Sequence, residues 1–418
     1  MGHERTIAVL ATLDTKGDEA GFLREEFQLL GATPLLVDLG IMGRPAVEPD
    51  VPAAEVAAAG GSTLEALRSG GSRQESSRVM AAGAAAILRE RIESGSLHGA
   101  LGLGGTQGTS LCGDIMQRLP YGFPKLILST AASGDTAPFV GIKDVTMMFA
   151  VGDILGLNPV LRKMLANAAG AVWGMARNDR SIAPDAGVRG TIAMTNLGVL
   201  TEGAMHAIDL FHEAGFEVIT FHAIGAGGRA MEQMMREGLI TGVFDYALGE
   251  ITDWMHGALR AADEHRLTVA AELGLPQVIC PGGAEHVGLL LPVAGQVPEA
   301  WRGHQHVFHS PVILAPRLDA GQLDAVGREI TRRLAGVRDR AVFMIPRGGV
   351  SRYSIAGGPL EDRAGDEAFF AALRETMPPA VRLVEREEAA EDPAFVEAAV
   401  ATLIELIEGG SAGAAPAG

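Results

Sequence analysis

The chain has 418 residues, and its 51 acidic and 34 basic side chains give a formal net charge of −17. An acidic surface of this kind repels nucleic acid, so we expect none among the ligands. No apolar run approaches the roughly 18 residues that span a bilayer, and no charged leader precedes an apolar segment. We therefore expect a cytoplasmic protein without a membrane partner.

The first half of the chain alternates short β-rich runs with amphipathic or Ala-rich helical runs. This alternation is typical of βαβ units and predicts an α/β fold built on a parallel sheet. We expect strands at Thr6–Thr12, Pro34–Leu39, His98–Leu103 and Lys125–Thr130, and helices at Asp18–Leu30, Gln74–Glu93, Thr109–Arg118 and Pro159–Trp173.

The length exceeds the roughly 250 to 300 residues that one hydrophobic core accommodates, so we expect two domains. Apolar periodicity is lost between Met175 and Val188, which places the boundary there. We predict an N-terminal domain at 1–180, a C-terminal α/β domain at 181–408 and a disordered tail at 409–418 that is rich in Gly and Ala. The second domain repeats the βα pattern, with strands at Gly190–Thr195, Glu217–Phe221, Gly242–Tyr246, Gln277–Cys280 and Ala341–Ile345 and helices at Glu202–Ala214, Ala230–Glu237, Ala320–Leu334 and Pro393–Ile407.

Glycine, hydroxyl and charged residues follow the predicted strands of the first domain. In a parallel sheet these positions lead into helix N-termini, whose free N–H groups and positive dipole attract anions. Two interpretations stay open for Lys16, a phosphate ligand or a solvated loop lysine, and two for Asp38, a ribose ligand or a turn-capping residue. The candidate nucleotide-binding residues are Thr12, Asp14, Thr15, Lys16, Asp38, Gly104, Gly105, Thr106, Gly108, Thr109, Ser129, Thr130, Ser133 and Gly134.

The second domain offers a further glycine loop at Phe221–Glu232, with His222 and Arg229 beside it. These side chains suit the recognition of a carboxylate or phosphate and proton transfer. A hydrogen-bonded structural histidine is the alternative for His222. The run His304–His309 places His304 and His306 on one strand face and His309 on the other, so we predict no metal site.

Together these motifs resemble the Tm-one-like ATP-binding protein family, which is named for the ATP-binding region of a tomato mosaic virus resistance protein. The resemblance runs from about Thr6 to Phe370. It implies two Rossmann-like subdomains with mainly parallel sheets, ATP binding in the first, and a homodimer, but it supplies no reaction. Its strongest carriers are Thr12–Gly17, Gly104–Thr109, Pro124–Gly134, Gly156–Asn158, Leu165–Ala169, Phe221–Glu232 and Pro346–Ser351.

The second domain departs from the family pattern. Where relatives have a threonine-rich stretch after a strand, this chain keeps only Asp245, Glu250 and Asp253, and we add Glu250 to His222 and Arg229 as candidate catalytic residues. The first hypothesis is an ATP-binding protein, which in its fuller form is an ATP-dependent enzyme that acts on a small anionic metabolite held between the two domains. Mg²⁺ would bridge the phosphates, helped by Asp14 or Asp135. The alternatives are a non-catalytic, nucleotide-responsive binding protein and an enzyme that acts on a carboxylate or phosphorylated metabolite without nucleotide.

Overall fold

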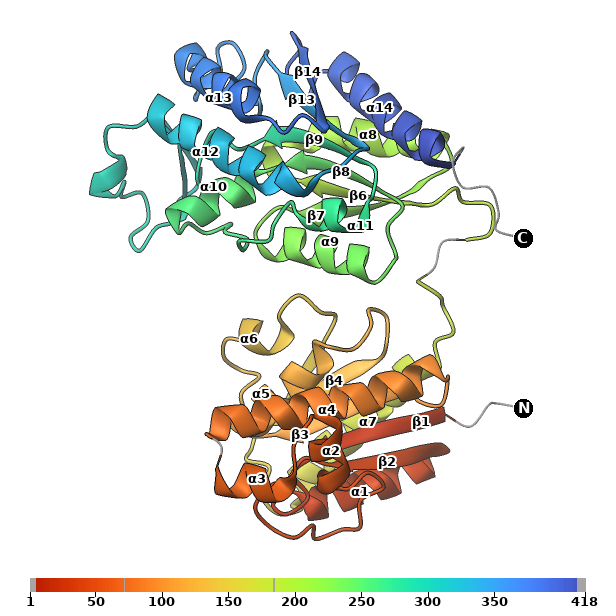
Figure 1. The fold of residues 1–418 in the computed structure, drawn as a ribbon. Helices are drawn as coiled ribbons and strands as arrows, with labels where there is room; N and C mark the ends of the chain where they lie inside the picture. Colours follow the sequence, from red (N-terminus) through yellow and green to blue (C-terminus); the bar gives the residue numbers. More distant parts are fainter. Residues whose placement is uncertain (1–4, 71, 183–184, 412–418) are drawn as a thin grey trace. The chain divides into compact units, whose positions relative to one another are not determined.

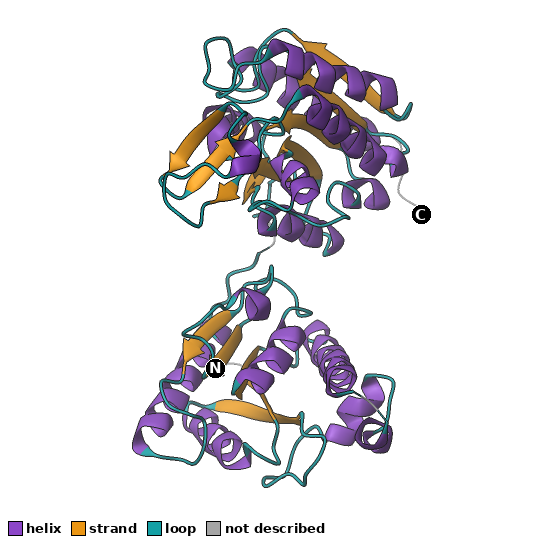
Figure 2. Cartoon of the chain, turned by 90° about the vertical axis from the view of Figure 1, so that its left-hand side faces the viewer, coloured by secondary structure: helices purple, strands orange, loops and turns teal. Residues whose placement is uncertain are grey.

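The computed structural model describes residues 5–70, 72–182 and 185–411. The chain divides into two compact units, Met1–Ile182 and Ala183–Gly418, which we call unit 1 and unit 2. Each unit has a central parallel sheet with helices on both faces (Figures 1 and 2). The prediction of an α/β protein with two Rossmann-like subdomains and mainly parallel sheets is confirmed.

The sheet of unit 1 has five parallel strands in the order β2-β1-β3-β4-β5. Its central strands are buried along nearly their whole length, as expected for strands covered on both faces. Strand β1 pairs with β2 on one side and β3 on the other, so the strand order reverses between β1 and β3. The strands are β1 (Arg5–Ala11), β2 (Ala32–Asp38), β3 (Gly99–Gly104), β4 (Lys125–Ser129) and β5 (Thr146–Phe149).

The two faces of this sheet are covered by different helices. Along β1, Ile7 and Val9 belong to one apolar cluster with Phe27 of α1, whereas Leu10 belongs to another with Met80 of α4. The helices α1 (Gly17–Leu29) and α7 (Pro159–Ala176) therefore cover one face, and α2 (Ala53–Ala59), α4 (Arg73–Glu93) and α5 (Thr106–Met116) cover the other. Two short helices, α3 (Leu64–Ser69) and α6 (Ala137–Val140), complete the unit.

The main sheet of unit 2 has six parallel strands in the order β14-β13-β9-β8-β6-β7, so the strand order again reverses, here between β6 and β8. Helices α8 and α14 pack on one face, and α9, α11, α12 and α13 contribute to the clusters on the other. The strands are β6 (Thr191–Asn196), β7 (Glu217–His222), β8 (Gly242–Ala247), β9 (Gln277–Gly282), β13 (Ala341–Pro346) and β14 (Val381–Arg386).

A small antiparallel sheet in the order β10-β12-β11 accompanies the main sheet of unit 2. Its strands are β10 (Leu289–Leu290), β11 (His306–Ser310) and β12 (Ile313–Pro316). The helices of unit 2 are α8 (Thr201–Glu213), α9 (Ala226–Arg236), α10 (Gly249–His256), α11 (Val269–Leu273), α12 (Ala320–Arg333), α13 (Arg363–Thr376) and α14 (Pro393–Ser411), with one-turn helices at Gly198–Leu200, Glu299–Trp301 and Leu334–Gly336.

Several helix boundaries differ from the predicted ones, by four residues at most. Helix α5 begins at Thr106 instead of Thr109, and α9 begins at Ala226 instead of Ala230. Gly108 lies in the first turn of α5, and Gly227 and Gly228 lie in the first turn of α9. The N–H groups of a first turn have no acceptor within the helix. Helix α14 runs to Ser411, so the predicted tail begins inside it, and residues 412–418 lie outside the described residues. Strands β5 and β14 and helices α10 and α13 were not predicted.

The packing of α2 on α4 depends on Gly83. A Cβ placed there would lie 1.9 Å from the carbonyl oxygen of Val56 and 2.7 Å from the amide nitrogen of Gly60, both backbone atoms. We expect Gly83→Ala to lower the free energy of unfolding of unit 1 by about 2 kcal/mol. Gly170 in α7 has nothing within 4 Å of this position, so Gly170→Ala should raise the same free energy by up to about 1 kcal/mol. Urea denaturation of both variants measures the contrast, and equal effects would contradict the close packing.

Candidate functional site

A pocket of about 860 Å³ lies at the carboxyl ends of β1, β2 and β3 in unit 1. The strand order reverses at this edge, and in open parallel sheets ligands bind in the crevice at such a reversal. The volume is within the range of small-molecule sites. The lining comes from Thr12 and Asp14–Lys16 after β1, from Leu39–Met42 after β2 and from Gly104–Gly108 at the start of α5, and residues of α3 and α4 and Asp153 complete it.

The start of α5 forms one wall of this pocket. Gly105 is the N-cap residue, and no side chain caps the first turn. The N–H groups of Thr106, Gln107 and Gly108 thus have no acceptor within the helix, and these residues line the pocket. A Cβ at Gly104 would lie 2.8 Å from the Cα of Gly108, so a glycine allows the strand to turn this tightly into the helix. Unpaired amides and the helix dipole make this wall suited to an anion.

The loop after β1 forms the second wall. The hydroxyl oxygens of Thr12 and Thr15 lie 2.7 Å apart, and the N–H groups of Thr15 and Lys16 donate to the carbonyl of Thr12 at 3.1 and 2.8 Å. The ammonium of Lys16 donates to the carbonyl of Ile154, in the loop after β5. Lys16 is therefore held at the pocket and is not a freely solvated loop lysine.

The two acidic candidates of these loops have different positions. Asp38 is buried, and its Oδ1 accepts hydrogen bonds from the N–H groups of Leu13 at 3.0 Å and Gly40 at 2.8 Å. Burial raises the pKa of this carboxyl, and the two N–H groups partly oppose that shift. Asp38 lies outside the pocket lining and ties two loops together, which agrees with the turn-capping interpretation. Asp14 lines the pocket, and its Oδ2 accepts from the N–H of Gly43 at 2.9 Å.

The predicted third wall, after β4, does not join the pocket. The hydroxyls of Thr109 and Ser129 are buried 2.6 Å apart and bond to each other, and Ser129 also accepts from the N–H of Ala131. The remaining candidates of this loop, Thr130, Ser133 and Gly134, lie outside the lining. The nearby Asp135 accepts from the N–H of Ala137 and is likewise outside it.

The structure adds pocket residues that sequence reasoning missed. Arg68 of α3, Arg73, Ser76 and Ser77 of α4, and Asp153 after β5 all line the pocket. A signal for the α4 residues was present, because Ser72 followed three residues later by Glu75 is a helix-start pattern. In the structure, the hydroxyl of Ser72 accepts from the N–H of Glu75. Recognising that pattern would have placed Arg73 at a helix N-terminus.

The three candidate catalytic residues of unit 2 do not form one cavity. His222 and Arg229 are exposed, whereas Glu250 is fully buried. The Oε1 atom of Glu250 accepts from the N–H groups of Gly225 at 2.6 Å and Gly228 at 3.0 Å. Glu250 thereby caps the start of α9, where the sequence had indicated an anion-binding loop. A carboxylate of the chain itself occupies that position.

Glu250 belongs to a buried ionic network around Arg266. The Nε of Arg266 donates to Glu250 at 2.8 Å, and its two terminal nitrogens donate to the carboxylate of Asp245 at 2.6 Å each. A third carboxylate, Glu232, lies 3.7 Å from the same guanidinium and accepts from the N–H of Leu267. Burial raises the pKa of Glu232 to about 7. One guanidinium therefore serves three carboxylates.

A second buried network lies after β9. Burial alone would raise the pKa of Glu285, but His286 at 3.1 Å, the hydroxyl of Ser351 and the charge of Arg317 hold it at about 2. Arg260 donates to the backbone carbonyl of His286 at 2.6 Å. Both Glu285 and Ser351 are buried, so this network stabilises the fold of unit 2 and presents no exposed nucleophile.

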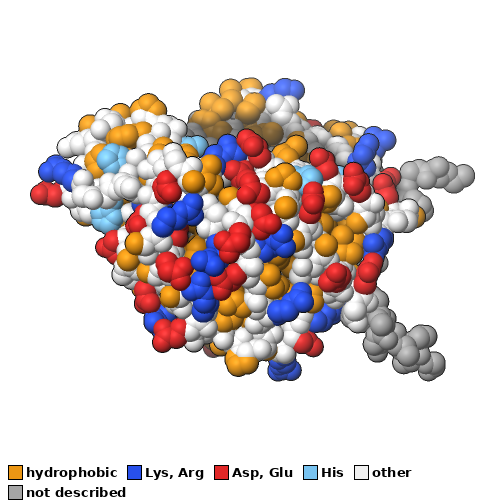
Figure 3. All heavy atoms as spheres, turned by 90° about the horizontal axis from the view of Figure 1, so that it is seen from above, with side chains coloured by type: hydrophobic (Ala, Val, Ile, Leu, Met, Phe, Trp, Pro, Cys, Tyr) orange, Lys and Arg blue, Asp and Glu red, His pale blue; other side chains and the backbone are white. Residues whose placement is uncertain are grey.

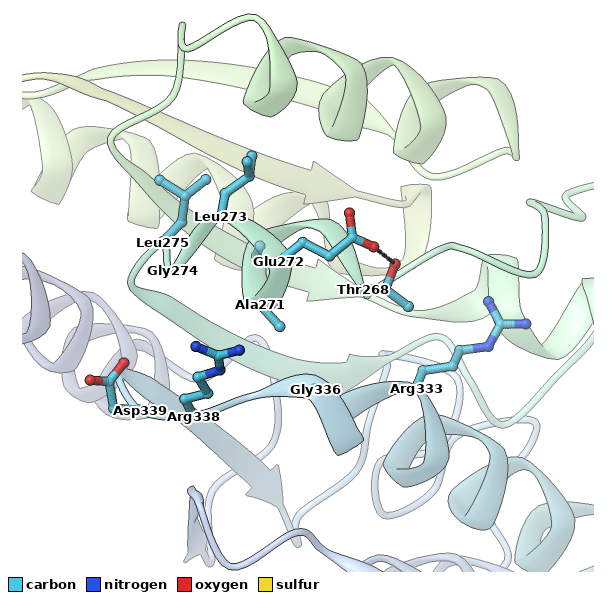
Figure 4. A pocket seen from close by; sticks show the side chains of 11 residues that line it. Thr268, Ala271, Glu272, Leu273, Gly274, Leu275, Arg333, Gly336, Arg338 and Asp339 are labelled. Carbon is cyan, nitrogen blue, oxygen red and sulfur yellow. Dashed lines mark hydrogen bonds between the residues drawn. The ribbon is translucent and has the colours of Figure 1, made fainter.

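A second pocket, of about 580 Å³, lies in unit 2 between α11 and the C-terminal end of α12 (Figure 4). The hydroxyl of Thr268 donates to Glu272 at 2.9 Å within it. Leu275 and Asp339 of its lining directly precede β9 and β13. This pocket therefore lies at the amino ends of the strands, the edge opposite the strand-order reversal, and contains none of the candidate site residues.

Charged side chains of both signs are interspersed on the face shown in Figure 3. Ion pairs of unit 2 include Arg374 with Glu385 at 2.6 Å and Arg328 with Asp324 at 2.9 Å. Among the described residues, no helix is long and apolar enough to cross a membrane. Within the same part of the chain, no group of three or more His, Cys, Asp or Glu side chains is arranged to hold a metal ion.

The fold defines a two-unit α/β protein with a pocket at the sheet edge of its first unit. Residues 5–181 match the model of the N-terminal domain of an uncharacterised protein family, UPF0261, and residues 189–407 match its C-terminal domain. The chain belongs to the UPF0261 family.

Relatives of this chain extend over most of its length. A UPF0261 protein of Clostridium tetani is 35% identical over 97% of this chain and 99% of its own length. One of Mesorhizobium japonicum is 36% identical over 96% of this chain and 98% of its own. The ToMV resistance protein Tm-1(GCR237) of Solanum lycopersicum is 32% identical over 64% of this chain and 36% of its own length. This similarity supports the link to the Tm-1 protein that the motifs indicated.

The raised pKa of Glu232 predicts a pH-dependent stability. Because the pKa is about 7 in the folded protein against an ordinary 4.5, the contribution to stability is fully present below pH 4.5 and is lost as the pH rises through 7. Glu232→Gln removes the ionisation, so its melting temperature relative to wild type should rise between pH 5 and pH 8. Thermal denaturation across this range measures it, with the exposed Glu213→Gln as control. A pH-independent difference would contradict the prediction.

Proposed function

We propose that unit 1 binds a nucleotide, ATP with Mg²⁺, in the pocket at the carboxyl ends of β1, β2 and β3. The observation that carries the proposal is the start of α5, where Gly105 leads into a first turn without a side-chain cap on the wall of a pocket of about 860 Å³. Helix starts of this kind bind phosphate groups. ATP is the nucleotide that the family resemblance implies.

The pocket offers different chemistry to the two ends of a nucleotide. The amides of Gly105–Gly108 and the ammonium of Lys16 suit phosphate oxygens, and the hydroxyls of Thr12 and Thr15 add neutral donors. The residues after β2 include Leu39, Ile41 and Met42, which supply an apolar surface for a base. Sites of this mixed character, largely apolar with a few placed polar groups, are typical of small-molecule binding.

The pocket also contains carboxylates that fit Mg²⁺. This ion prefers oxygen ligands and is usually held by one or two carboxylates together with substrate phosphates. Asp14 and Asp153 line the pocket and would hold the ion, whereas Asp135 lies outside the lining. When bound, Mg²⁺ would neutralise part of the phosphate charge.

A nucleotide-binding protein without catalytic turnover is favoured over an enzyme that uses the three candidate residues of unit 2. Both carboxylate oxygens of Glu250 are engaged by groups of the chain itself, and the residue is fully buried. His222 and Arg229 are exposed outside both pockets. We therefore propose ligand binding as the activity of unit 1 and assign no reaction to unit 2.

Gly105→Asp tests the proposal without disturbing the fold. Gly105 has an ordinary φ of −73°, and the nearest atom to an added Cβ is the Thr130 hydroxyl at 3.7 Å. Aspartate is a favourable N-cap residue, so the free variant should be at least as stable as wild type. Its carboxylate would occupy the first-turn amides and repel phosphate. Wild type should gain several degrees in melting temperature when ATP–Mg²⁺ is about 100-fold above its Kd, and Gly105→Asp should gain none.

Gly174→Asp is the matched control, since Gly174 is exposed in α7 with nothing within 4 Å of its Cβ position. This variant should keep the full ATP-dependent rise in melting temperature. The absence of any rise for wild type at millimolar ATP and Mg²⁺ would refute nucleotide binding. A full rise in Gly105→Asp would refute the assignment of the phosphates to the start of α5.

A further inference from the structure

The pocket of unit 1 has more cationic side chains than carboxylates in its lining. Lys16, Arg68 and Arg73 line it, together with the carboxylates of Asp14 and Asp153. The chain as a whole has 51 acidic and 34 basic residues, so an excess of cations at one pocket departs from the general composition. The lining is therefore suited to an anionic ligand, and the positions of the three cations decide how long that anion can be.

The two arginines of the lining belong to α3 and α4, whereas Lys16 lies in the loop between β1 and α1. Arg68 belongs to α3, and its Nε donates to the backbone carbonyl of Ile41, which fixes it at the pocket. Arg73 is the first residue of α4 and is exposed. Within the described part of the chain, no hydrogen bond or ion pair engages the Arg73 guanidinium. Ser77, one turn further along the same face of α4, also lines the pocket.

Three helices begin at this pocket. Helix α1 leaves the edge on one face of the sheet, whereas α4 and α5 pack on the other and share an apolar cluster that includes Met80 and Leu111. Each helix start carries the positive end of a dipole. Helix α5 begins after β3, and β3 pairs with β1, the strand that precedes Lys16. Helix α5 also packs beside α4, the helix that carries Arg73. Phosphate-binding groups therefore extend from Lys16 across α5 to α4.

We propose that Arg73, supported by Arg68, binds the far end of a phosphate chain, and that the pocket thereby selects nucleoside di- and triphosphates over monophosphates. The inference rests on the proposed nucleotide site. In this arrangement a single phosphate would bind the first-turn amides of α5 and Lys16, and the further phosphates of a longer chain would bind the guanidinium of Arg73. Arginine suits this position because its planar group donates two parallel hydrogen bonds to phosphate oxygens.

The test compares wild type with Arg73→Gln and Arg89→Gln by isothermal titration with ATP–Mg²⁺, ADP–Mg²⁺, AMP and inorganic tripolyphosphate. Arg89 is also an exposed arginine of α4 but lies outside the pocket lining, so it controls for the lost charge. Wild type should bind ATP at least about tenfold more tightly than AMP. Arg73→Gln should lose about tenfold in affinity for ATP and tripolyphosphate and nothing for AMP, and Arg89→Gln should match wild type.

The outcomes separate this inference from the proposed function. Equal losses for ATP and AMP in Arg73→Gln, or no loss for either, would overturn the assignment of Arg73. Tripolyphosphate binding that depends on Arg73, without binding of any nucleotide, would support the phosphate-chain site and refute the nucleotide site. If neither tripolyphosphate nor nucleotide binds to wild type, both proposals fall. Unchanged melting temperatures of the unliganded variants would show that the substitutions leave the fold intact.

Discussion

The parallel arrangement of the strands is the constraint that determines where helices begin in both units. When neighbouring strands run in one direction, each connection must return across the sheet, so each crossover helix starts at the same edge. That edge collects unpaired amides and positive dipole ends. In unit 1 the helices that follow β1 and β3 cover opposite faces, and the pocket lies where they diverge. The position of the pocket is thus a consequence of strand order.

Unit 2 has the same reversal of strand order, but a side chain of the chain itself accepts the hydrogen bonds of the amides at the start of α9. The carboxylate of Glu250 accepts from the amides of Gly225 and Gly228 at the start of α9, as an anionic ligand would. Its charge is balanced by Arg266, which also holds Asp245. A buried charge is tolerated only when it is paired and hydrogen-bonded, and this network meets that condition. In unit 1, by contrast, no side chain caps the start of α5.

The sequence predicts the α/β fold and two of the pocket walls because these depend on local patterns. Strand and helix periodicities are read over short windows, and Gly104–Gly105 stands between a strand and a helix. The remaining features arise from residues distant in sequence. The hydrogen bond between Glu250 and Gly225 joins residues 25 positions apart, and that between Thr109 and Ser129 joins residues 20 positions apart. A local sequence pattern does not predict either hydrogen bond. Arg68 and Arg73 belong to helices outside the strand-end loops, and the local helix-start pattern at Ser72 marks the start of α4 without showing that this start lies at the pocket.

The proposed binding of a polyanion is compatible with the acidic composition of the chain once the range of the charges is considered. At physiological ionic strength, charges separated by more than about 8 Å are largely screened, so the net charge of −17 has little effect inside a pocket. The field there is set by the cations Lys16, Arg68 and Arg73, by the carboxylates of Asp14 and Asp153, and by the three helix starts. A duplex nucleic acid would meet the acidic surface over a wide area, whereas a small anion meets only these groups. The net charge therefore argues against nucleic acid as a ligand, and it does not argue against a small anion.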